Sequence, residues 1–213
     1  MWAVVPIKGF EAPKRRLATI LSPAERGRLA AQMMQDVLAT LTGLIGVMVV
    51  SGDARVLEMA DGLGARAETE RWPMGYSTAV RQAAETLASE GVGAMMHVPG
   101  DVPLITTDEV AQVAAAHQAA PAVTVVPSRD RDGTNCLALS PPTLLRPAFG
   151  ADSFERHCAL ARQAGVEPTV LSLPGFALDI DTPADLRLFC QRAGDGRSLR
   201  YLTEAGIVER ING

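Results

Sequence analysis

The pattern of apolar and polar positions divides the chain into short apolar runs and longer amphipathic segments. Four runs rich in β-branched residues are expected to form buried strands: 2–7, 46–51, 94–98 and 122–126. Four stretches with helical spacing accompany them: 23–41, 54–63, 78–89 and 107–118. Because strands and helices alternate, the pattern predicts an α/β fold, with a mostly parallel central sheet and helices on both faces.

Beyond Asp132 the alternation is looser. The expected elements there are a hairpin-like strand over 134–140, a helix over 152–164, a strand over 169–173 and a last helix from Pro183. No repeat and no low-complexity linker interrupts the 213 residues, a length that one domain can have. We therefore expect a single domain over 1–213, with an accessory layer after Asp132.

Helix starts are marked by capping residues. Ser22, Pro23 and Glu25 offer an N-cap, a proline in the first turn and a carboxylate three residues after the cap. Residues 107–109 give a second such start.

Composition and charge restrict the partners. The net charge is -4 and the pI is about 5.4, whereas nucleic acids and anionic membranes both require a basic face, so we expect neither as a partner. The first residues carry no charged lead-in and no long apolar stretch, which argues against a signal peptide or a membrane span and favours the cytoplasm. Cys136, Cys158 and Cys190 lack the spacing of a zinc site and are expected to be reduced thiols.

Candidate chemistry lies directly after the strands, because an open parallel sheet binds ligands beyond the carboxyl ends of its strands. The loop after the first strand carries Lys8, Lys14, Arg15 and Arg16. These cations are candidates for binding nucleotide phosphates, with loop amides as further donors. The alternative is an ordinary solvated basic loop.

Asp101 follows the third apolar run and stands between Pro99 and Pro103. This constrained position suits a ligand of Mg²⁺, which prefers carboxylates together with substrate phosphates. The alternative is an acid that caps the next helix, for which Thr106 and Asp108 are also available.

Asp179 and Asp181 form an Asp-x-Asp motif that is expected on an extended strand, where both carboxylates point to one side. Two like charges held close favour a cation between them, so these acids and Asp101 are candidates for one magnesium site. As the alternative, Asp181 is the N-cap of the last helix. Asp185 is expected to complement the helix dipole.

Two glycine-containing turns form the remaining candidate site. Gly133 and Gly150 let the backbone approach a ligand, and Thr134 and Ser153 supply hydroxyl donors. Ser153 also stands where a helix is expected to begin, a favourable place for an acceptor phosphate. His157, one turn later, is a candidate to reach the same acceptor; the alternatives are two ordinary turns and a packed histidine.

In this order, the segments resemble the 2-phospho-L-lactate guanylyltransferase family, which has the nucleotide-diphospho-sugar transferase (GT-A-like) fold, over nearly the whole chain. The resemblance is carried by Val5-Pro6-Ile7-Lys8, Lys14-Arg15-Arg16-Leu17, Pro99-Gly100-Asp101-Val102-Pro103, Gly133-Thr134-Asn135, Phe149-Gly150 with Ser153-Phe154 and His157, and Leu178-Asp179-Ile180-Asp181-Thr182-Pro183. The last three are rather specific when they occur together.

The resemblance implies transfer of GMP from GTP to a small phosphorylated three-carbon acid, with release of pyrophosphate, in the biosynthesis of coenzyme F-420. The acceptor would be 2-phospho-L-lactate, phosphoenolpyruvate or 3-phosphoglycerate, the cofactor Mg²⁺, and a further partner the downstream deazaflavin transferase. Residues 1–130 would form the nucleotide-binding half, and 131–213 the acceptor-binding half with the C-terminal tail.

Residue roles follow from the same resemblance. The nucleotide contacts would be Pro6, Lys8, Lys14, Gly75, Ser77 and Asp101, the acceptor contacts Thr134, Asn135, Gly150, Ser153 and His157, and the magnesium ligands Asp101, Asp179 and Asp181. Lys14 and Asp101 are the catalytic candidates. An acceptor phosphate would attack the α-phosphorus in line without a covalent enzyme intermediate, so positioning and charge neutralisation would carry the rate.

The chain departs from the family pattern at two places. After Gly75 it has Tyr76 and Ser77 where the family has Leu-Asn, and Gly100 replaces a common alanine. These departures affect the nucleotide-base contacts and the acceptor pocket.

Two other interpretations stay open. One is another nucleotidyltransferase of the same fold that acts on a sugar phosphate or a molybdopterin, although the Gly-Gly pair expected of the molybdopterin type is replaced here by Lys8-Gly9-Phe10. The other is a non-catalytic nucleotide-binding module, which the presence of all three candidate metal acids disfavours. The apolar residues of the tail at 198–211 would pack either on the chain's own core or on a second subunit, and we expect a homodimer.

Overall fold

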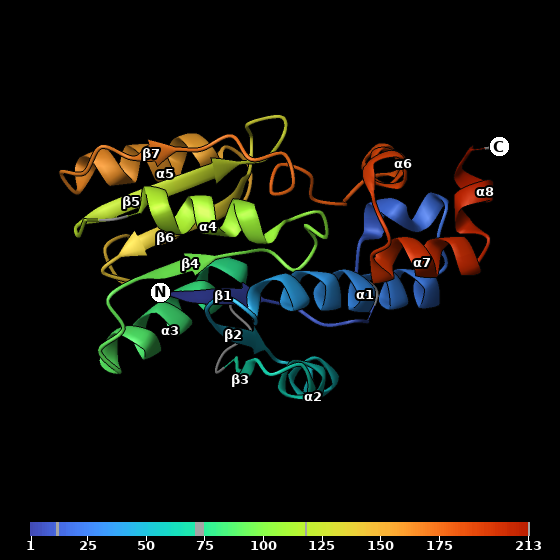
Figure 1. The fold of residues 1–213 in the computed structure, drawn as a ribbon, viewed down its shortest axis with the longest axis horizontal. Coiled ribbons are helices and arrows are strands. Elements are labelled where there is room, and N and C mark those ends of the chain that lie inside the picture. Colours follow the sequence, from blue (N-terminus) through green and yellow to red (C-terminus); the bar gives the residue numbers. More distant parts are fainter. Residues whose placement is uncertain (12, 71–74, 118, 213) are drawn as a thin grey trace.

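The computed structural model describes residues 1–11, 13–70, 75–117 and 119–212. A seven-stranded sheet in the order β3-β2-β1-β4-β6-β5-β7 forms its centre (Figure 1). The strands are β1 (Trp2–Pro6), β2 (Gly46–Ser51), β3 (Arg66–Thr69), β4 (Met95–His97), β5 (Ala122–Pro127), β6 (Thr134–Ser140) and β7 (Thr169–Val170). Only β6 runs antiparallel to its neighbours, β4 and β5, while the other pairs are parallel. The predicted α/β fold with a mostly parallel sheet is confirmed.

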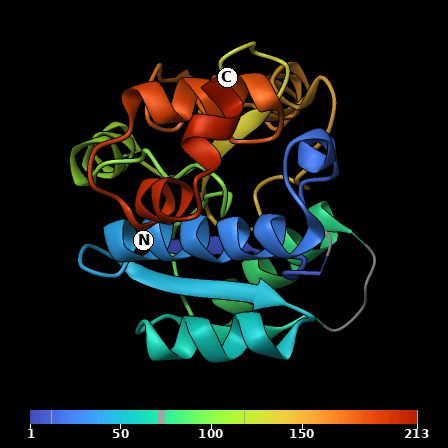
Figure 2. The same ribbon diagram turned by 90° about the vertical axis from the view of Figure 1, so that its right-hand side faces the viewer.

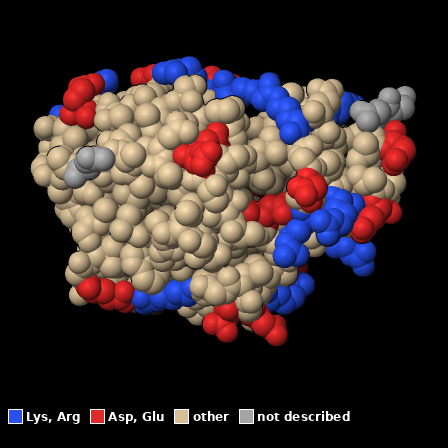
Figure 3. Space-filling view, in the orientation of Figure 1, with Lys and Arg blue, Asp and Glu red and all other residues tan. Residues whose placement is uncertain are grey.

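Helices surround this sheet, and the face of the molecule in Figure 3 carries scattered charged side chains of both signs. The helices are the 3-10 helix η1 (Arg15–Thr19), α1 (Pro23–Leu41), α2 (Ala54–Gly62), α3 (Tyr76–Ser89), α4 (Thr107–Ala116), α5 (Ser153–Gln163), α6 (Pro183–Arg192), α7 (Arg197–Glu204) and α8 (Ile207–Asn212). In the described ranges, no helix combines the length and the apolar character that a membrane span requires.

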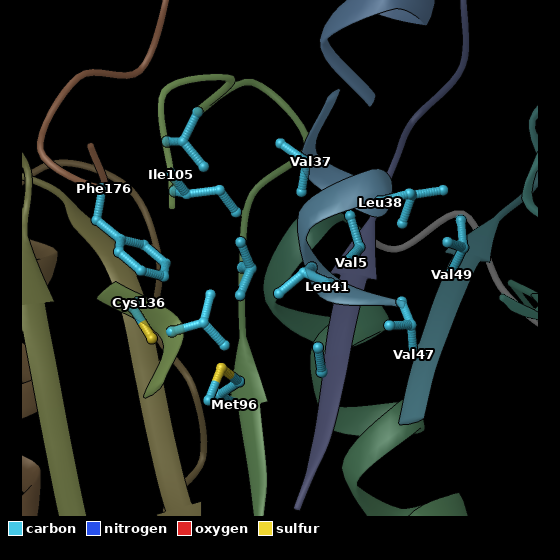
Figure 4. Packing of buried hydrophobic residues seen from close by; sticks show 14 of the residues in the cluster. Val5, Val37, Leu38, Leu41, Val47, Val49, Met96, Ile105, Cys136 and Phe176 are labelled. Atoms are coloured by element: carbon cyan, nitrogen blue, oxygen red, sulfur yellow. The ribbon is translucent and has the colours of Figure 1, made fainter. Parts of the chain in front are cut away.

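Alternation along the strands sends side chains to two cores, one on each face of the sheet. In β1, Ala3 and Val5 belong to one cluster and Val4 to the other, as the period of two in a strand requires. The first cluster is covered by α1, α2 and α4, and Figure 4 shows Val37, Leu38 and Leu41 of α1 packed over Val5, Val47 and Val49. The second is covered by α3 and α5.

A third cluster joins the C-terminal tail to the rest of the chain. It contains Leu17 of η1, Leu29 and Met33 of α1, and Phe189, Leu202 and Ile211 of the last three helices, all buried. Figure 2 shows α7, in red, beside α1, in blue, and α8 packs against α7 and α6. The tail therefore packs on the chain's own core.

Among the described helices, three begin with a capping box. Ser22 and Glu25 form the predicted capping box of α1, and Thr106 with Glu109 forms that of α4. At α6 the cap is Thr182, paired with Asp185. The alternative in which Asp181 caps this helix is therefore wrong, and Asp181 is left available for the site.

Several expected boundaries differ from the structure. The edge strand β3 was not predicted because its residues are alternately half-buried and exposed, so it contains no apolar run. Strand β7 ends at Val170 rather than 173, α5 begins at Ser153, and the expected helix end at Gln118 lies outside the described residues. Residues 179–181 are not in a strand of the sheet, which corrects the expectation for the Asp-x-Asp motif.

Candidate functional site

The candidate site is a cavity of about 1280 Å³ lined by the segments that follow β1, β2 and β4. The turns that lead into β6 and α5, with the first residues of both elements, complete it: residues 132–135, 149–151 and 153, together with Asp179 and Asp181. The position of this cavity is consistent with the expectation that the candidate residues gather beyond the carboxyl ends of the parallel strands.

Lys14 lies between two of the candidate acids. Its Nζ donates to Asp101 Oδ2 and, over 2.6 Å, to Asp181 Oδ1. Burial alone would lower the pKa of Lys14, but the charges and hydrogen bonds of Asp101 and Asp181 outweigh it and raise the pKa above its ordinary value. The side chain is only 10% exposed, so a permanent cation is held at the wall of the cavity.

The backbone at Lys14 is unusual as well. Its φ of 51° places it in the left-handed region, directly before η1 begins at Arg15. Such a conformation is uncommon for a residue with a side chain. It turns the loop so that Leu17 is buried in the third cluster while Lys14 reaches the acids.

Asp101 has one carboxylate oxygen without a partner. Oδ2 accepts from Lys14, whereas Oδ1 is buried and has no hydrogen-bond donor in the part of the chain that the structure describes. A buried unpaired carboxylate oxygen is costly, and a bound ligand that supplies a cation or a donor would relieve that cost. The backbone carbonyl of Asp101 accepts from Ile180 N over 3.1 Å, which ties this loop to the Asp-x-Asp segment.

In the Asp-x-Asp segment, buried apolar side chains alternate with acidic side chains that line the cavity, although the segment is not a strand of the sheet. Leu178 and Ile180 are buried in the third cluster, while Asp179 and Asp181 line the cavity. Asn135 donates from Nδ2 to Asp179 Oδ1 over 3.0 Å and to the Phe176 carbonyl over 2.8 Å. Burial and the nearby charge of Asp101 raise the pKa of Asp179, so a cation in this region would relieve unfavourable electrostatics.

These acids fit a divalent cation through their chemistry rather than through a preformed cage. Asp101, Asp179 and Asp181 line one cavity and offer the hard oxygen ligands that Mg²⁺ prefers, including the unpaired Oδ1 of Asp101. In the described part of the chain, however, no group of three or more His, Cys, Asp or Glu side chains is already arranged around one metal position. Magnesium commonly takes one or two carboxylates and completes its shell with substrate phosphates and water.

The candidate acceptor residues lie together at one side of the cavity. Gly133, Thr134, Gly150 and Ser153 all line it. Ser153 is the first residue of α5, and the preceding N-cap residue makes no side-chain capping bond. The backbone N–H groups of Ser153 and Phe154 donate instead to the carbonyls of Gly150 and Asp132, which ties the helix start to the turn before β6.

His157 does not line the cavity. It is fully buried, and its two ring nitrogens are engaged by Thr134 and by the backbone of Ala148. The sequence placed His157 in contact with the acceptor, whereas the structure places it behind Thr134.

The candidate nucleotide residues are more spread out. Pro6 and Lys8 line both the main cavity and a smaller one of about 320 Å³, and Gly75 lines the smaller one, next to Tyr76 and Glu70. Arg15 and Arg16 are exposed at the rim of the main cavity.

Ser77 lines neither cavity. Its Oγ accepts from Phe149 N over 2.9 Å, so it connects the start of α3 to the loop before α5.

Sequence reasoning missed Asp53 as a site residue. It caps α2, lines the main cavity and accepts from Phe10 N over 3.2 Å, which anchors the loop after β1. A Cβ at Gly9, where φ is +135°, would come within 3.0 Å of Asp53 Oδ2, so the loop passes close to this carboxylate. The signal is present in the sequence, because Asp53 lies two residues after the end of β2 and the same positional rule applies to it.

Comparison with known sequences identifies the same family that the sequence motifs resemble. The model of the family described as guanylyl transferase CofC like matches residues 1–211. A phosphoenolpyruvate guanylyltransferase of Rubrobacter xylanophilus is 37% identical over 188 residues, covering 87% of this chain and 91% of that protein. One of Sphaerobacter thermophilus is 38% identical over 200 residues, covering 92% and 95%.

Comparison with solved structures supports the fold. A crystal structure from Desulfovibrio desulfuricans, assigned to the nucleotide-diphospho-sugar transferases, superposes with a TM-score of 0.79. The alignment covers 99% of this chain and 97% of that one at 17% sequence identity. The GT-A-like architecture expected from the sequence is therefore confirmed.

Proposed function

The chain belongs to the CofC-like guanylyl transferase family, and from this premise we propose that it transfers GMP from GTP to phosphoenolpyruvate. The family assignment makes it a guanylyltransferase, an enzyme of the nucleotidyltransferase class. The identity of the acceptor is a more specific assignment than the class of enzyme. Relatives at 37% and 38% identity bear the name of phosphoenolpyruvate guanylyltransferase, which supports this acid over 2-phospho-L-lactate and 3-phosphoglycerate.

One observation carries the proposal on the structural side. Lys14 and the acids Asp101 and Asp181 share a cavity with the hydroxyl residues Thr134 and Ser153. Lys14, together with a Mg²⁺ ion held by the carboxylates, would suit the triphosphate. The neutral hydroxyl donors of Thr134 and Ser153 would suit a small anionic acceptor.

The reaction joins an acceptor phosphate oxygen to the α-phosphorus of GTP. The bond from that phosphorus to the β-bridging oxygen breaks, and pyrophosphate leaves with the electron pair. An acceptor phosphate is already ionised at neutral pH, so the attacking oxygen needs no general base. The product is a GMP unit linked to the acid through a diphosphate, which we place on the route to coenzyme F-420.

The chain's own residues bind and orient the two substrates. Lys14 would pair with the nucleotide phosphates and stabilise the charge that develops on them, while Thr134 and Ser153 would donate to the acceptor. Asp101, Asp179 and Asp181 would hold Mg²⁺, which when bound neutralises the triphosphate and orients it. The main contribution of the protein is thus positioning and electrostatics.

The test presents purified protein with GTP, MgCl₂ and each of the three phospho-acids in separate reactions. The deazaflavin acceptor and its transferase are added to trap an unstable product, and products are identified by mass spectrometry. Turnover with phosphoenolpyruvate above that with the other two acids is expected. Preference for another acid would overturn the acceptor proposal, and parallel reactions with ATP and CTP test the choice of nucleotide.

A matched pair of variants links the activity to the site. Asp101→Asn removes a charge at the cavity and is expected to lower kcat/KM by about 10²-fold or more, in the range typical for loss of an electrostatic contact to a reacting group. Asp108→Asn makes the same change at an exposed acid in the first turn of α4 and serves as the control. Equal activity of the two variants would contradict the assignment of the cavity.

A further inference from the structure

His157 joins two walls of the acceptor side of the cavity from behind. Its Nδ1 lies 2.9 Å from Thr134 Oγ1 in β6, and its Nε2 lies 3.0 Å from the backbone nitrogen of Ala148. The imidazole is fully buried. Any effect on a ligand must therefore pass through the groups that it holds.

The bond with Ala148 decides which ring nitrogen carries the proton. A backbone N–H can only donate, so Nε2 of His157 must accept with its lone pair. In a neutral imidazole the proton then sits on Nδ1. Burial is the main reason that the pKa of His157 is lowered, to about 4, so the ring is neutral near pH 7.

The proton on Nδ1 fixes the role of Thr134 in turn. Nδ1–H donates to Oγ1, which uses an acceptor position of the hydroxyl and leaves its own hydrogen to be donated elsewhere. In the described part of the chain, Thr134 Oγ1 has no other hydrogen-bond partner, and Thr134 lines the cavity. The hydroxyl is thus prepared as a donor.

We propose that His157 is a positioning residue that holds the Thr134 hydroxyl as a hydrogen-bond donor to an anionic oxygen of the acceptor acid. This inference rests on the proposed function, because it assigns the acceptor to the side of the cavity that contains Thr134. The second hydrogen bond of His157 holds the neighbouring turn of the cavity, since Ala148 immediately precedes Phe149 and Gly150.

The surroundings limit the freedom of the imidazole. The Phe149 ring lies 4.9 Å from the His157 ring in an edge-on arrangement, and Phe149 N is itself bound to Ser77 Oγ. A 180° rotation of the ring about its Cβ–Cγ bond would put carbon atoms in place of both nitrogens and break both the Thr134 and the Ala148 bonds. The packing therefore preserves the orientation that makes Thr134 a donor.

The first test is independent of turnover. Imidazole ¹⁵N resonances of the ligand-free protein, assigned by comparison with His157→Asn, report which nitrogen carries the proton. A protonated Nδ1 and an unprotonated Nε2 are expected for His157 at pH 7. The reverse tautomer would overturn the proposal whatever the enzyme's substrate.

Two substitutions separate the two bonds of the ring. His157→Asn keeps an amide donor near the Nδ1 position but loses the acceptor for Ala148 N–H. His157→Gln keeps an acceptor near the Nε2 position but provides no donor for Thr134. His157→Gln is expected to raise the KM for the acceptor acid about tenfold, and His157→Asn by less than about threefold, with the KM for GTP unchanged in both.

A double-mutant cycle between His157 and Thr134 tests whether both act through the Thr134 hydroxyl. Thr134→Val is expected to raise the acceptor KM about tenfold, and combining it with His157→Gln is expected to add almost nothing because both act through one hydroxyl. Additive effects, or a larger defect in His157→Asn than in His157→Gln, would show that His157 only supports the loop and would overturn the proposal. If wild-type protein transfers GMP to none of the acids, the proposed function fails, and the ¹⁵N result still decides the tautomer.

Discussion

The hydroxyl of Tyr76 lies 2.7 Å from Nε2 of His97, which joins the first residue of α3 to the last residue of β4. His97 is buried, and its Nδ1 has no hydrogen-bond partner in residues 1–11, 13–70, 75–117 and 119–212. Among the described residues, Tyr76 is therefore the only hydrogen-bond partner of this imidazole. Tyr76 is also a position at which the chain departs from the Leu-Asn pattern of its family, and it lines both cavities.

Tyr76→Phe is expected to destabilise the protein by about 1 to 3 kcal/mol, because it leaves both nitrogens of a buried imidazole unpaired. Urea unfolding followed by circular dichroism measures the change. Tyr201→Phe is the matched control, since its hydroxyl makes one long bond of 3.4 Å to the Glu25 carbonyl and should contribute less. An equal loss in the two variants would contradict the importance of the Tyr76 bond.

Acid should destabilise the fold before its surface carboxylates are protonated. Burial lowers the pKa of His97 to about 3 and, together with the charge of Arg156, that of His157 to about 4, from ordinary values of about 6.5. The unfolded chain therefore binds more protons than the folded one between about pH 6.5 and 4, so stability falls as the pH decreases through this window. Each histidine contributes up to about 1.4 kcal/mol per pH unit.

The contribution of His157 to this pH dependence can be measured by comparing the wild-type protein with a His157 variant. Asp179 acts in the opposite sense because its pKa is raised, so the wild-type slope alone mixes several groups. His157→Asn removes a single titrating ring and is expected to make the decline of unfolding free energy between pH 6.5 and 4 shallower by about one proton. Urea titrations at several pH values measure this, and identical slopes would mean that His157 is protonated in the folded state.

The strands of the sheet could be predicted from local pattern wherever they carry apolar runs. Val4 and Val5 face opposite cores and are both fully buried, which produces the continuous apolar run of a strand covered on both faces. Strand β3 lies at the sheet edge and keeps polar side chains such as Glu68, so no comparable run marks it. The extended form of the Asp-x-Asp segment is set by the burial of Leu178 and Ile180, not by pairing in the sheet.

The partners within the site could not be predicted in the same way. Lys14 and Asp181 are 167 residues apart, and nothing in either local sequence specifies that one binds the other. His157 illustrates the same limit. Its position one turn into α5 was visible, but its tautomer depends on a backbone amide contributed by the loop before that helix.

Gly100 packs closely against Ile7 in the loop after β1. A Cβ at this position would lie 2.1 Å from Cδ1 of Ile7, so an alanine requires the end of that side chain to move. Because the clashing atom is the end of a flexible side chain, Gly100→Ala is expected to lose about 1 kcal/mol of stability, at the lower end of the cost of overpacking. Ile7→Val removes the clashing methyl group.

The double variant Gly100→Ala with Ile7→Val tests that contact directly. It is expected to recover most of the loss, giving a favourable coupling energy of about 1 kcal/mol in a double-mutant cycle of urea unfolding. Ile7→Val in the wild-type background is the control for the lost methyl group. Additive effects would mean that Gly100 is needed for its backbone conformation rather than for the space that Ile7 occupies.

Lys14 and Lys8 provide a matched pair of cations in the same loop. Lys14 is nearly buried and pairs with Asp101 and Asp181, whereas Lys8 is exposed at the rim of both cavities. Lys14→Met should lower kcat by about 10²- to 10³-fold, because it removes a fixed charge where the reaction develops negative charge. Lys8→Met should chiefly raise the KM for GTP, since a solvated lysine contributes mainly to attraction of the phosphates. Steady-state kinetics with GTP varied at saturating magnesium and acceptor separate these effects, and a Lys14→Met enzyme with undiminished kcat would remove Lys14 from the reacting site.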